Sequence, residues 1–295
     1  MKNVAKCLLC LIASAAFSCG LSAAEKLLVA GCGWNKIMII DKKTGAKDWV
    51  YEIPNYRECN SVDITPDRNI VYANKSGAAL VSLKKKVIWE YKAKEGEELH
   101  TARRLANGNF LLGICGHPAR FVELSKSGKV LKETSFDTGI ENVHAQFRVV
   151  SKNRRGNYIA ALWGKPKIVE ISPRGELVKE IPLRSGAFAI EELKNGNYLV
   201  SCGDRGALEV INSSTGEVAR RIDNSNLDSD FKILFAASAQ QLDSGDILLA
   251  NWNGHSKDKS QPKLVQIDSK NRAVWSLKDD AEIANISAVK YVKSI

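Results

Sequence analysis

The sequence predicts an all-β fold, a six-bladed β-propeller of four-stranded blades, and three observations carry this prediction. A polar turn followed by a short apolar run that ends at glycine recurs, as in "ANGNFLLGICG" (106–116) and "KNGNYLVSCG" (194–203). A hairpin-like segment follows each run. The units are spaced by 40 residues between Gly156 and Gly196 and by 49 between Gly196 and Gly245. Four strands repeating at this period are typical of propeller blades.

The first motif predicts the turn from the inner strand of each blade to the second strand. It occurs at 66–77, 106–116, 154–164, 194–203 and 243–254. Each copy opens with a polar turn drawn from residues such as Asn, Asp and Gly, which tight turns prefer, and Gly permits a positive φ. We therefore interpret these glycines as serving backbone geometry and not phosphate binding.

The second motif predicts the outer hairpin of each blade. It occurs six times, at 36–53, 79–91, 120–136, 167–181, 207–222 and 263–277. Each copy holds two alternating strands around a tight turn such as "KKTG" or "SSTG", which is a hairpin signature. One further strand precedes the first motif at 100–105, 146–150, 188–193 and 238–242, and completes the four-stranded blade.

The two ends of the chain predict how the ring closes. The first hairpin, with the strand before it, lacks an inner strand, and the final strand "ISAVKYV" (286–292) has no blade of its own. We expect this C-terminal strand to pair beside the strand that starts near Lys26 and so to complete the N-terminal blade. Closure removes an open sheet edge.

Residues 1–24 predict a secretory signal peptide, and residues 25–295 a single propeller domain. Two lysines, a short apolar core and small residues precede the expected cleavage after Ala24. We expect an exported protein, periplasmic, secreted or at the cell surface; a lipid anchor at Cys19 is the alternative. No later segment reaches the length of a transmembrane helix.

The charge of the chain does not predict a nucleic-acid partner. The formal net charge is +10, and removal of Lys2 and Lys6 leaves 41 Lys and Arg against 33 Asp and Glu, a net charge of +8. The basic doublets are spread along the chain and no basic aromatic motif accompanies them. Solvated strand faces and turns account for them.

Four cysteines follow the predicted signal peptide. Cys32, Cys115 and Cys202 recur at one blade position, where we interpret them as small buried side chains. Their blades are not adjacent, so their Cα atoms should lie beyond disulfide reach. Only Cys59 is expected near enough to Cys32 to form a bond.

One face of the predicted ring is the candidate binding face. Connections of variable length, the usual carriers of binding residues, lie opposite the stereotyped turns. All four histidines fall on this face, and we expect His100 and His144 to begin the inner strands of successive blades, exposed beside the central channel. The predicted ligand-binding residues are His100, His144, His117, Asn60, Trp163, Trp252 and Arg205. The alternative is that the histidines only hydrogen-bond loop carbonyls and the tryptophans only pack between blades.

Two groups of segments resemble known propeller families. "IIDKKTGAKDWVYEI" and "LVSLKKKVIWEYKA" resemble the D-x-x-T-G-x-x-x-W repeat of the PQQ-like, or quinoprotein-like, β-propellers. "LHTARRLANGNFLLG" with "RFVELSKSGKV" is similar to the His-led blade of arylsulfotransferase-like propellers. The resemblance implies the fold, and it implies that a catalytic histidine would map to His100 or His144. The adjacent Cys-Cys pair and eight blades of quinoprotein dehydrogenases are absent from the sequence.

Three functions remain open from the sequence. The first is an exported, non-catalytic binding protein that holds a glycan, peptide or partner protein in the channel mouth. The second is a lyase or hydrolase with a metal on His100, His144 and His117 and with Glu98 or Glu141 as base. The third is group transfer through a nucleophilic histidine, with Arg103 or Arg205 holding an anion. Since no HxH or HExxH spacing is present, no metal ligand is assigned, and the cofactor stays open.

Overall fold

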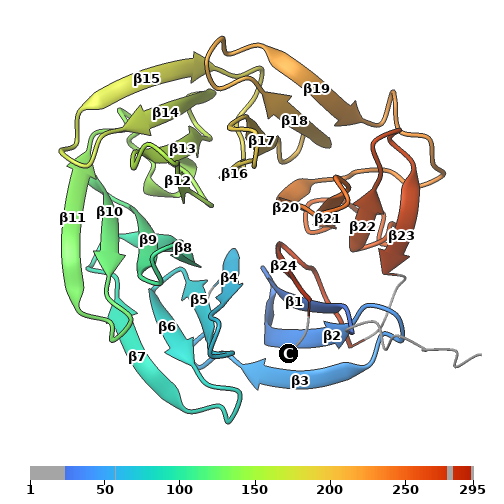
Figure 1. Cartoon of the computed structure of the whole chain (residues 1–295), viewed down its shortest axis with the longest axis horizontal. Coiled ribbons are helices and arrows are strands. Elements are labelled where there is room, and N and C mark those ends of the chain that lie inside the picture. The colour runs from blue at the N-terminus through green and yellow to red at the C-terminus, as the bar shows by residue number, and fades with distance from the viewer. Residues whose placement is uncertain (1–23, 57, 278–281, 294–295) are drawn as a thin grey trace, which may run out of the picture.

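A computed structural model describes residues 24–56, 58–277 and 282–293. Six four-stranded antiparallel sheets form a closed ring around a central channel (Figure 1), which confirms the predicted six-bladed propeller. The described residues contain one short 3-10 helix, η1 (Val143–Ala145), between the third and fourth blades. No helix in these ranges has the length and apolar composition that a membrane crossing needs. The predicted signal peptide lies outside the described residues.

The strands of each blade are labelled A to D from the channel outward. Blade 1 comprises β24 (Ala288–Val292), β1 (Lys26–Gly31), β2 (Trp34–Asp41) and β3 (Lys47–Glu52). Blade 2 comprises β4 (Ser61–Ile64), β5 (Ile70–Asn74), β6 (Gly77–Val81) and β7 (Val87–Lys92). Blade 3 comprises β8 (Glu98–Arg104), β9 (Phe110–Cys115), β10 (Ala119–Leu124) and β11 (Val130–Phe136).

The second half of the ring repeats this order. Blade 4 comprises β12 (Ser151–Lys152), β13 (Tyr158–Leu162), β14 (Lys167–Ile171) and β15 (Leu177–Pro182). Blade 5 comprises β16 (Ala189–Glu192), β17 (Tyr198–Ser201), β18 (Ala207–Ile211) and β19 (Val218–Asp223). Blade 6 comprises β20 (Ala236–Gln241), β21 (Ile247–Asn251), β22 (Leu264–Ile267) and β23 (Ala273–Leu277).

The C-terminal strand closes the ring as the sequence predicts. β24 pairs antiparallel with β1, in a register that runs from Lys26 opposite Val292 to Ala30 opposite Ala288. It also bonds to blade 6, since the Val289 backbone N–H donates to Ser238 Oγ over 2.9 Å. The last strand therefore joins the first and last blades.

Gly31 marks the closest approach in this closure. A Cβ built at Gly31 would lie 1.7 Å from the carbonyl oxygen of Asn285, in the backbone that leads into β24. We expect Gly31→Ala to lower the free energy of unfolding by about 2 kcal/mol, because the closing segment must shift. Gly196→Ala is the control, since no atom lies within 4 Å of that Cβ and only the left-handed backbone (φ +85°) is strained, at about 1 kcal/mol. Urea unfolding measures both, and equal stabilities would contradict the expected clash.

The polar turns of the first motif lie on one face of the ring, here called the lower face. Gly108 and Gly196 adopt φ values of 84° and 85° in these A–B turns, as the motif predicts. Their N–H groups donate to the carbonyls of Leu105 and Leu193, each over 2.9 Å. The B–C and D–A connections therefore lie on the opposite, upper face.

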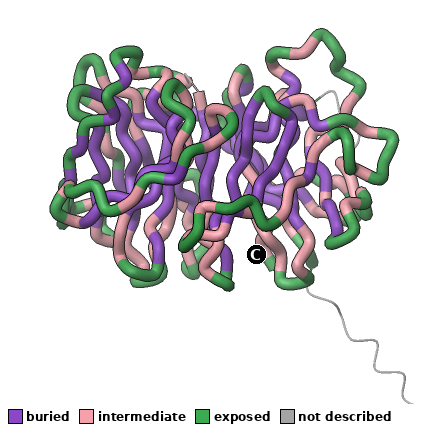
Figure 2. Tube along the Cα trace, turned by 90° about the horizontal axis from the view of Figure 1, so that it is seen from above, coloured by how far each residue is buried: buried purple, intermediate pink, exposed green. Residues whose placement is uncertain are grey.

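The core is divided among the blade interfaces. Six clusters of buried apolar residues are present in the described chain. Five of them span two neighbouring blades, and the sixth joins blades 6 and 1 with Phe188 and Ala189 of blade 5. The second and third strands of each blade are largely buried (Figure 2). The large exposed apolar residues of the described chain lie on the outermost strands. The buried strands therefore hold the connections at the channel mouth in place.

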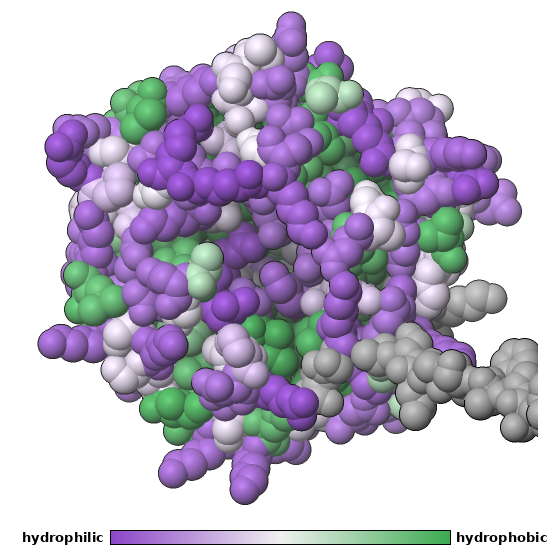
Figure 3. Space-filling view, viewed as in Figure 1, coloured by the Kyte–Doolittle hydropathy of each residue, from purple (hydrophilic) through white to green (hydrophobic). Residues whose placement is uncertain are grey.

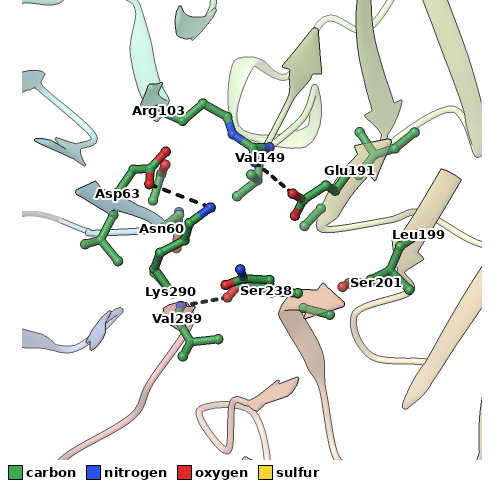
Figure 4. Close-up of a pocket in the computed structure, with 17 residues that line it drawn as sticks. Asn60, Asp63, Arg103, Val149, Glu191, Leu199, Ser201, Ser238, Val289 and Lys290 are labelled. Carbon is green, nitrogen blue, oxygen red and sulfur yellow. Dashed lines mark hydrogen bonds and ion pairs between the residues drawn. The ribbon is translucent and has the colours of Figure 1, made fainter. Parts of the chain in front are cut away.

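Salt bridges cross the central channel below its mouth. Arg103 Nη2 lies 3.4 Å from Glu191 Oε1, and Lys290 Nζ lies 3.7 Å from Asp63 Oδ1 (Figure 4). The space left among these inner-strand residues is about 40 Å³. This volume admits little more than one or two water molecules.

One predicted strand is wrong, and the one cysteine pair that could have bonded is not joined. The inner strand expected at 146–150 is reduced to β12, because the preceding backbone bonds to neighbouring blades: Thr101 Oγ1 donates to the Arg148 carbonyl, and the Val149 N–H donates to the Phe188 carbonyl. Cys32 and Cys59 are both free thiols. Cys32 Sγ donates toward Asn60 Oδ1, whereas Cys59 Sγ donates to the Ser61 carbonyl.

Candidate functional site

A cavity of about 530 Å³ lies at the channel mouth on the upper face, and we call it the funnel. B–C connections contribute Gly33 and His255, and D–A connections contribute Glu58 and Asn142. Figure 3 shows the opposite, lower face, on which a hollow lies at the centre of the ring among mostly hydrophilic residues. A cavity of this size is in the range of small-molecule sites.

One wall of the funnel is aromatic and comes from blades 4 to 6. Its members are Trp163, Phe188, Phe235, Trp252 and His255. Phe235 is the centre of this wall: it stacks on Trp163 at 6.0 Å between centroids and meets Trp252 edge-on at 5.1 Å. Such pairs contribute about 1 kcal/mol each beyond their buried area, so the rings hold one another in position.

The opposite wall is polar. Arg148 Nη1 donates to the His144 carbonyl over 2.5 Å, and its Nε lies 3.7 Å from Glu58 Oε1. Asn142 Oδ1 accepts from the His144 N–H and begins η1, which places the His144 side chain at the cavity. The wall therefore combines a carboxylate, a guanidinium and an imidazole.

A buried amide sets the hydrogen-bond directions beneath this wall. Asn60 Nδ2 lies 2.9 Å from Glu58 Oε1 and 3.1 Å from His100 Nδ1, while Asn60 Oδ1 accepts from the Cys32 thiol. A carboxylate only accepts, so the Asn60 nitrogen must face Glu58, and it donates to His100 as well. His100 Nδ1 is therefore an acceptor, and its hydrogen is on Nε2.

Burial keeps His100 neutral. Its side chain is fully buried, and the desolvation of the charged form lowers its pKa to about 4, although the hydrogen bond to Glu98 opposes this. The neutral ring donates from Nε2 to Glu98 Oε2 over 2.9 Å. Asn60 thus fixes the tautomer in which His100 donates a hydrogen bond to Glu98.

Glu98 gathers three donors around one carboxylate. Oε2 accepts from His100 Nε2 and lies 2.6 Å from His144 Nδ1, and Oε1 lies 3.0 Å from Lys75 Nζ. Burial by itself raises the pKa of Glu98, but the hydrogen bonds from these three groups hold it well below its usual range. Because the ionised carboxylate only accepts, His144 Nδ1 carries the hydrogen, and the Nε2 of a neutral His144 is a free acceptor.

The same three residues form a cluster of metal-ligand type, but their hydrogen bonds do not fit a metal. One ligand atom each of Glu98, His100 and His144 lies within 4.8 Å of the others. A metal on His100 Nε2 needs Nδ1–H to donate to an acceptor. Asn60 Nδ2 donates there instead, and a turned amide would place its oxygen 2.9 Å from Glu58 Oε1. The hydrogen-bond partners of His100 therefore disfavour a metal at this cluster.

The funnel contains some of the predicted residues and not others. His144 is accessible, with 47% of its side chain exposed, and lines the cavity with Trp163 and Trp252. His117 Nε2 donates to the Glu141 carbonyl over 2.9 Å, outside the funnel lining. Arg205 lines a separate hollow behind Trp163.

The prediction that His100 is solvent-accessible is wrong. His100 is 1% exposed and Asn60 is also 1% exposed, so both lie beneath the funnel and act through other residues. His144 does not hold the blade position equivalent to His100. Counting back five residues from Leu105 and Asn153, the first residues of the two A–B turns, gives His100 and Arg148 as the equivalent pair.

This register gives the predicted Asn60 again and also finds funnel residues that the sequence reasoning missed. The same count of five gives Asn60 in blade 2 and Phe188 in blade 5, and Phe235 lies two residues earlier than the count in blade 6, where β20 has a bulge. Arg148, Phe188 and Phe235 all line the funnel, and the first two follow from the count itself. Nothing in the repeat marks Glu58, which stands in an irregular connection.

Comparison with known proteins places this architecture in a family. A family model described as Mal s 1 allergenic protein-like matches residues 32–272. The chain is similar to a crystal structure described as a protein of unknown function from Bacteroides caccae, at 36% identity and a TM-score of 0.88, covering 91% of this chain and 99% of that chain. No curated protein matches.

More distant structures share the fold alone. A catalytically inactive virginiamycin B lyase from Staphylococcus aureus with quinupristin matches at 13% identity and a TM-score of 0.61, covering 92% of this chain and 93% of that chain. A nidogen/laminin complex matches at 13% identity and a TM-score of 0.62, covering 92% of this chain and 100% of that chain. The propeller part of the predicted resemblance is confirmed, and its quinoprotein and arylsulfotransferase details stay predictions.

Proposed function

We propose a function for this chain, which belongs to the Mal s 1 allergenic protein-like family. It is a binding protein that holds a small glycan-like molecule in the funnel. The description of the family names no ligand, so the proposal rests on the cavity. The observation that carries it is the pairing of an aromatic wall with a polar wall in one cavity of about 530 Å³. A ligand with an apolar ring face and hydroxyl groups matches both walls.

The charges of the polar wall favour a neutral ligand. Glu58 and Glu98 are offset by Lys75 and Arg148, which lie within 4.0 Å of these carboxylates. Hydroxyl groups can donate to the Glu58 carboxylate and the His144 imidazole and accept from the guanidinium of Arg148. The apolar face of a sugar ring can stack on the aromatic wall.

The depth of the funnel favours a small molecule over a peptide or a partner protein. The cavity is concave, and the channel below it is filled by side chains that include the Arg103–Glu191 and Asp63–Lys290 pairs. A ligand therefore enters and leaves from the upper face. The exported location of this binding protein is likewise our proposal, from residues 1–24.

Trp252 provides the test of this function. We expect p-nitrophenyl β-glucoside to quench the tryptophan fluorescence saturably, and Trp252→Ala to weaken its binding about tenfold through lost stacking. Trp275→Ala is the matched control, because that ring lies on the outermost strand β23, where its Nε1 donates to the Lys42 carbonyl. The melting temperature of each variant reports on folding. Binding that survives Trp252→Ala unchanged, or no saturable binding to wild type, would contradict the proposal.

A further inference from the structure

We propose that the funnel also hydrolyses a carboxylic ester seated in it, with His144 as the general base that activates water, Glu98 as its positioning residue and Arg148 as the group that faces the developing oxyanion. This inference rests on the proposed function, because the same cavity must first hold the substrate. It adds a reaction to a site for which the comparisons give none.

The first step of the argument is the orientation of His144. Its Nδ1 lies 2.6 Å from Glu98 Oε2, and the ring lines the funnel. When a carboxylate accepts a hydrogen bond from one nitrogen of a neutral imidazole, the other nitrogen carries no hydrogen and is the stronger base. Hydrolases in which an acidic residue orients a histidine use this arrangement. His144 Nε2 is this second nitrogen.

The second step is that Glu98 is fixed on every side. Lys75 Nζ holds Oε1, and the buried His100 holds Oε2, itself fixed by Asn60 and through it by Glu58. The carboxylate can therefore not turn away from His144. Preorganised support of this kind is what a catalytic base requires.

The third step is a cation on the same wall. Arg148 lines the funnel, and its Nη1 is bonded to the His144 and Phe147 carbonyls. Its Nη2 donates to no described residue within hydrogen-bond distance. A guanidinium at this place can stabilise the negative oxygen that forms when water attacks an ester carbonyl.

Other reactions fit the funnel less well. Burial, with the nearby Glu58 carboxylate, raises the pKa of Cys32, so this thiol is a poor nucleophile. Glycoside cleavage needs a protonated carboxylic acid. Burial raises the pKa values of Glu58 and Glu98, but their charged and hydrogen-bonding neighbours lower these values by more. Both side chains are therefore ionised, and neither supplies that acid.

The reaction balances with water as the only co-reactant. A proton passes from water to His144 Nε2 as the water oxygen bonds to the acyl carbon, and the carbonyl electron pair moves to the oxygen near Arg148. That pair then re-forms the carbonyl as the bond from the acyl carbon to the alkoxy oxygen breaks. His144 returns its proton to the leaving alcohol, so the products are a carboxylic acid and an alcohol.

A second histidine of the funnel also pairs with a carboxylate, whereas His117 lies outside the funnel lining and supplies the control variant. His255 lies on the aromatic wall, and its Nδ1 is 2.8 Å from Asp204 Oδ1, so it too pairs with a carboxylate. Asp204 is 53% exposed, whereas Glu98 is 17% exposed and held by three donors. Exposed pairs of this kind impose little order. The inference therefore assigns the reaction to His144 and not to His255.

The test is p-nitrophenyl acetate hydrolysis by the purified full chain. We expect a rate that lies above that of equimolar free imidazole and is unchanged by EDTA. His144→Gln should lower kcat/KM about 100-fold, and Glu98→Gln should lower kcat at least about tenfold with KM unchanged. His117→Gln should leave the rate unchanged, because His117 lies outside the funnel lining.

Glucoside binding by the same variants separates this inference from the proposed function. His144→Gln keeps an acceptor oxygen, so its affinity for p-nitrophenyl β-glucoside should stay within about threefold of wild type. Four outcomes would each overturn the reaction while the binding result stands: a wild-type rate equal to that of imidazole, a rate unaffected by His144→Gln, a rate lost in His117→Gln, or a rate lost in EDTA and restored by zinc. Loss of glucoside binding with hydrolysis intact would overturn the proposed function instead.

Discussion

Removal of residues 286–295 is expected to unfold the protein. Their strand, β24, is the inner strand of blade 1 and pairs with β1 over five residue pairs. Without it the channel side of β1 becomes a bare edge, and the seam between the first and last blades opens. No other described strand can take its place, because every other inner strand precedes its own blade in the chain.

The size of the effect follows from the apolar groups that leave the core. Ile286 and Val289 belong to the cluster between blades 6 and 1, with exposures of 0% and 7%. Truncating such side chains to Ala costs about 2–5 kcal/mol each for the larger ones. The loss of two such side chains together with a whole strand is comparable to the free energy of unfolding of a typical domain, which is about 5–15 kcal/mol.

Urea unfolding and soluble expression measure this loss. The control removes residues 293–295 only and keeps β24, so it should unfold at the wild-type urea concentration. Because the full truncation is not expected to fold, Ile286→Ala gives the graded version, with an expected loss of about 3 kcal/mol. A truncated chain with the wild-type unfolding midpoint would show that β24 does not close the ring.

Acidification from pH 7 to pH 5 is expected to lower the free energy of unfolding by about 2 kcal/mol through His100 alone. Burial lowers its pKa from 6.5 to about 4 in the folded chain. Between these values the unfolded chain binds a proton that the folded chain does not, so stability is full above pH 6.5 and falls as the pH drops. A shift of this size corresponds to about 3 kcal/mol once the pH is below 4.

Other groups act in a different pH window. The lowered pKa values of Glu58 and Glu98 stabilise the fold above the ordinary range of glutamate, and that contribution is lost only when the pH falls below about 4.5. The interval from pH 7 to pH 5 therefore isolates imidazole protonation from these two carboxylates. Within it, His100 carries a large and specific part of the change.

His100→Gln tests this assignment. A glutamine amide can accept from Asn60 and donate to Glu98, as the neutral imidazole does, but it does not titrate. Urea unfolding at pH 7, 6 and 5 should show a smaller loss of stability for the variant, by about 2 kcal/mol, whatever its stability at pH 7. Equal losses in both proteins would mean that His100 is protonated in the folded state.

The blades could be predicted from local patterns because each blade is built from neighbours in the chain. The A–B turns need a positive φ, which glycine supplies at Gly108 and Gly196, and the outer hairpins alternate as strands do. Closure by β24 followed from one unmatched strand and one incomplete blade. In these cases the sequence signal and the structural cause are the same residues.

The candidate site was predicted only in part. His144, Trp163 and Trp252 line the funnel as expected, and the repeat register finds Arg148 and Phe188 once the blades are aligned at their turns. His100 was misjudged because a strand entrance can face the opening or lie beneath it. The difference depends on the irregular segment 142–148, which covers His100 and places His144 over it.

The sequence by itself determined the number of blades, the closure and the face that carries the variable connections, because turns and strand alternation are local properties of the chain. Only the tertiary structure decided what the histidines do. Asn60, Glu98 and His144 come from three different blade connections and strands, and each is fixed by a hydrogen bond over forty or more residues in sequence. Tautomer, burial and pKa depend on such distant partners, so the chemistry of the funnel emerges when the ring closes.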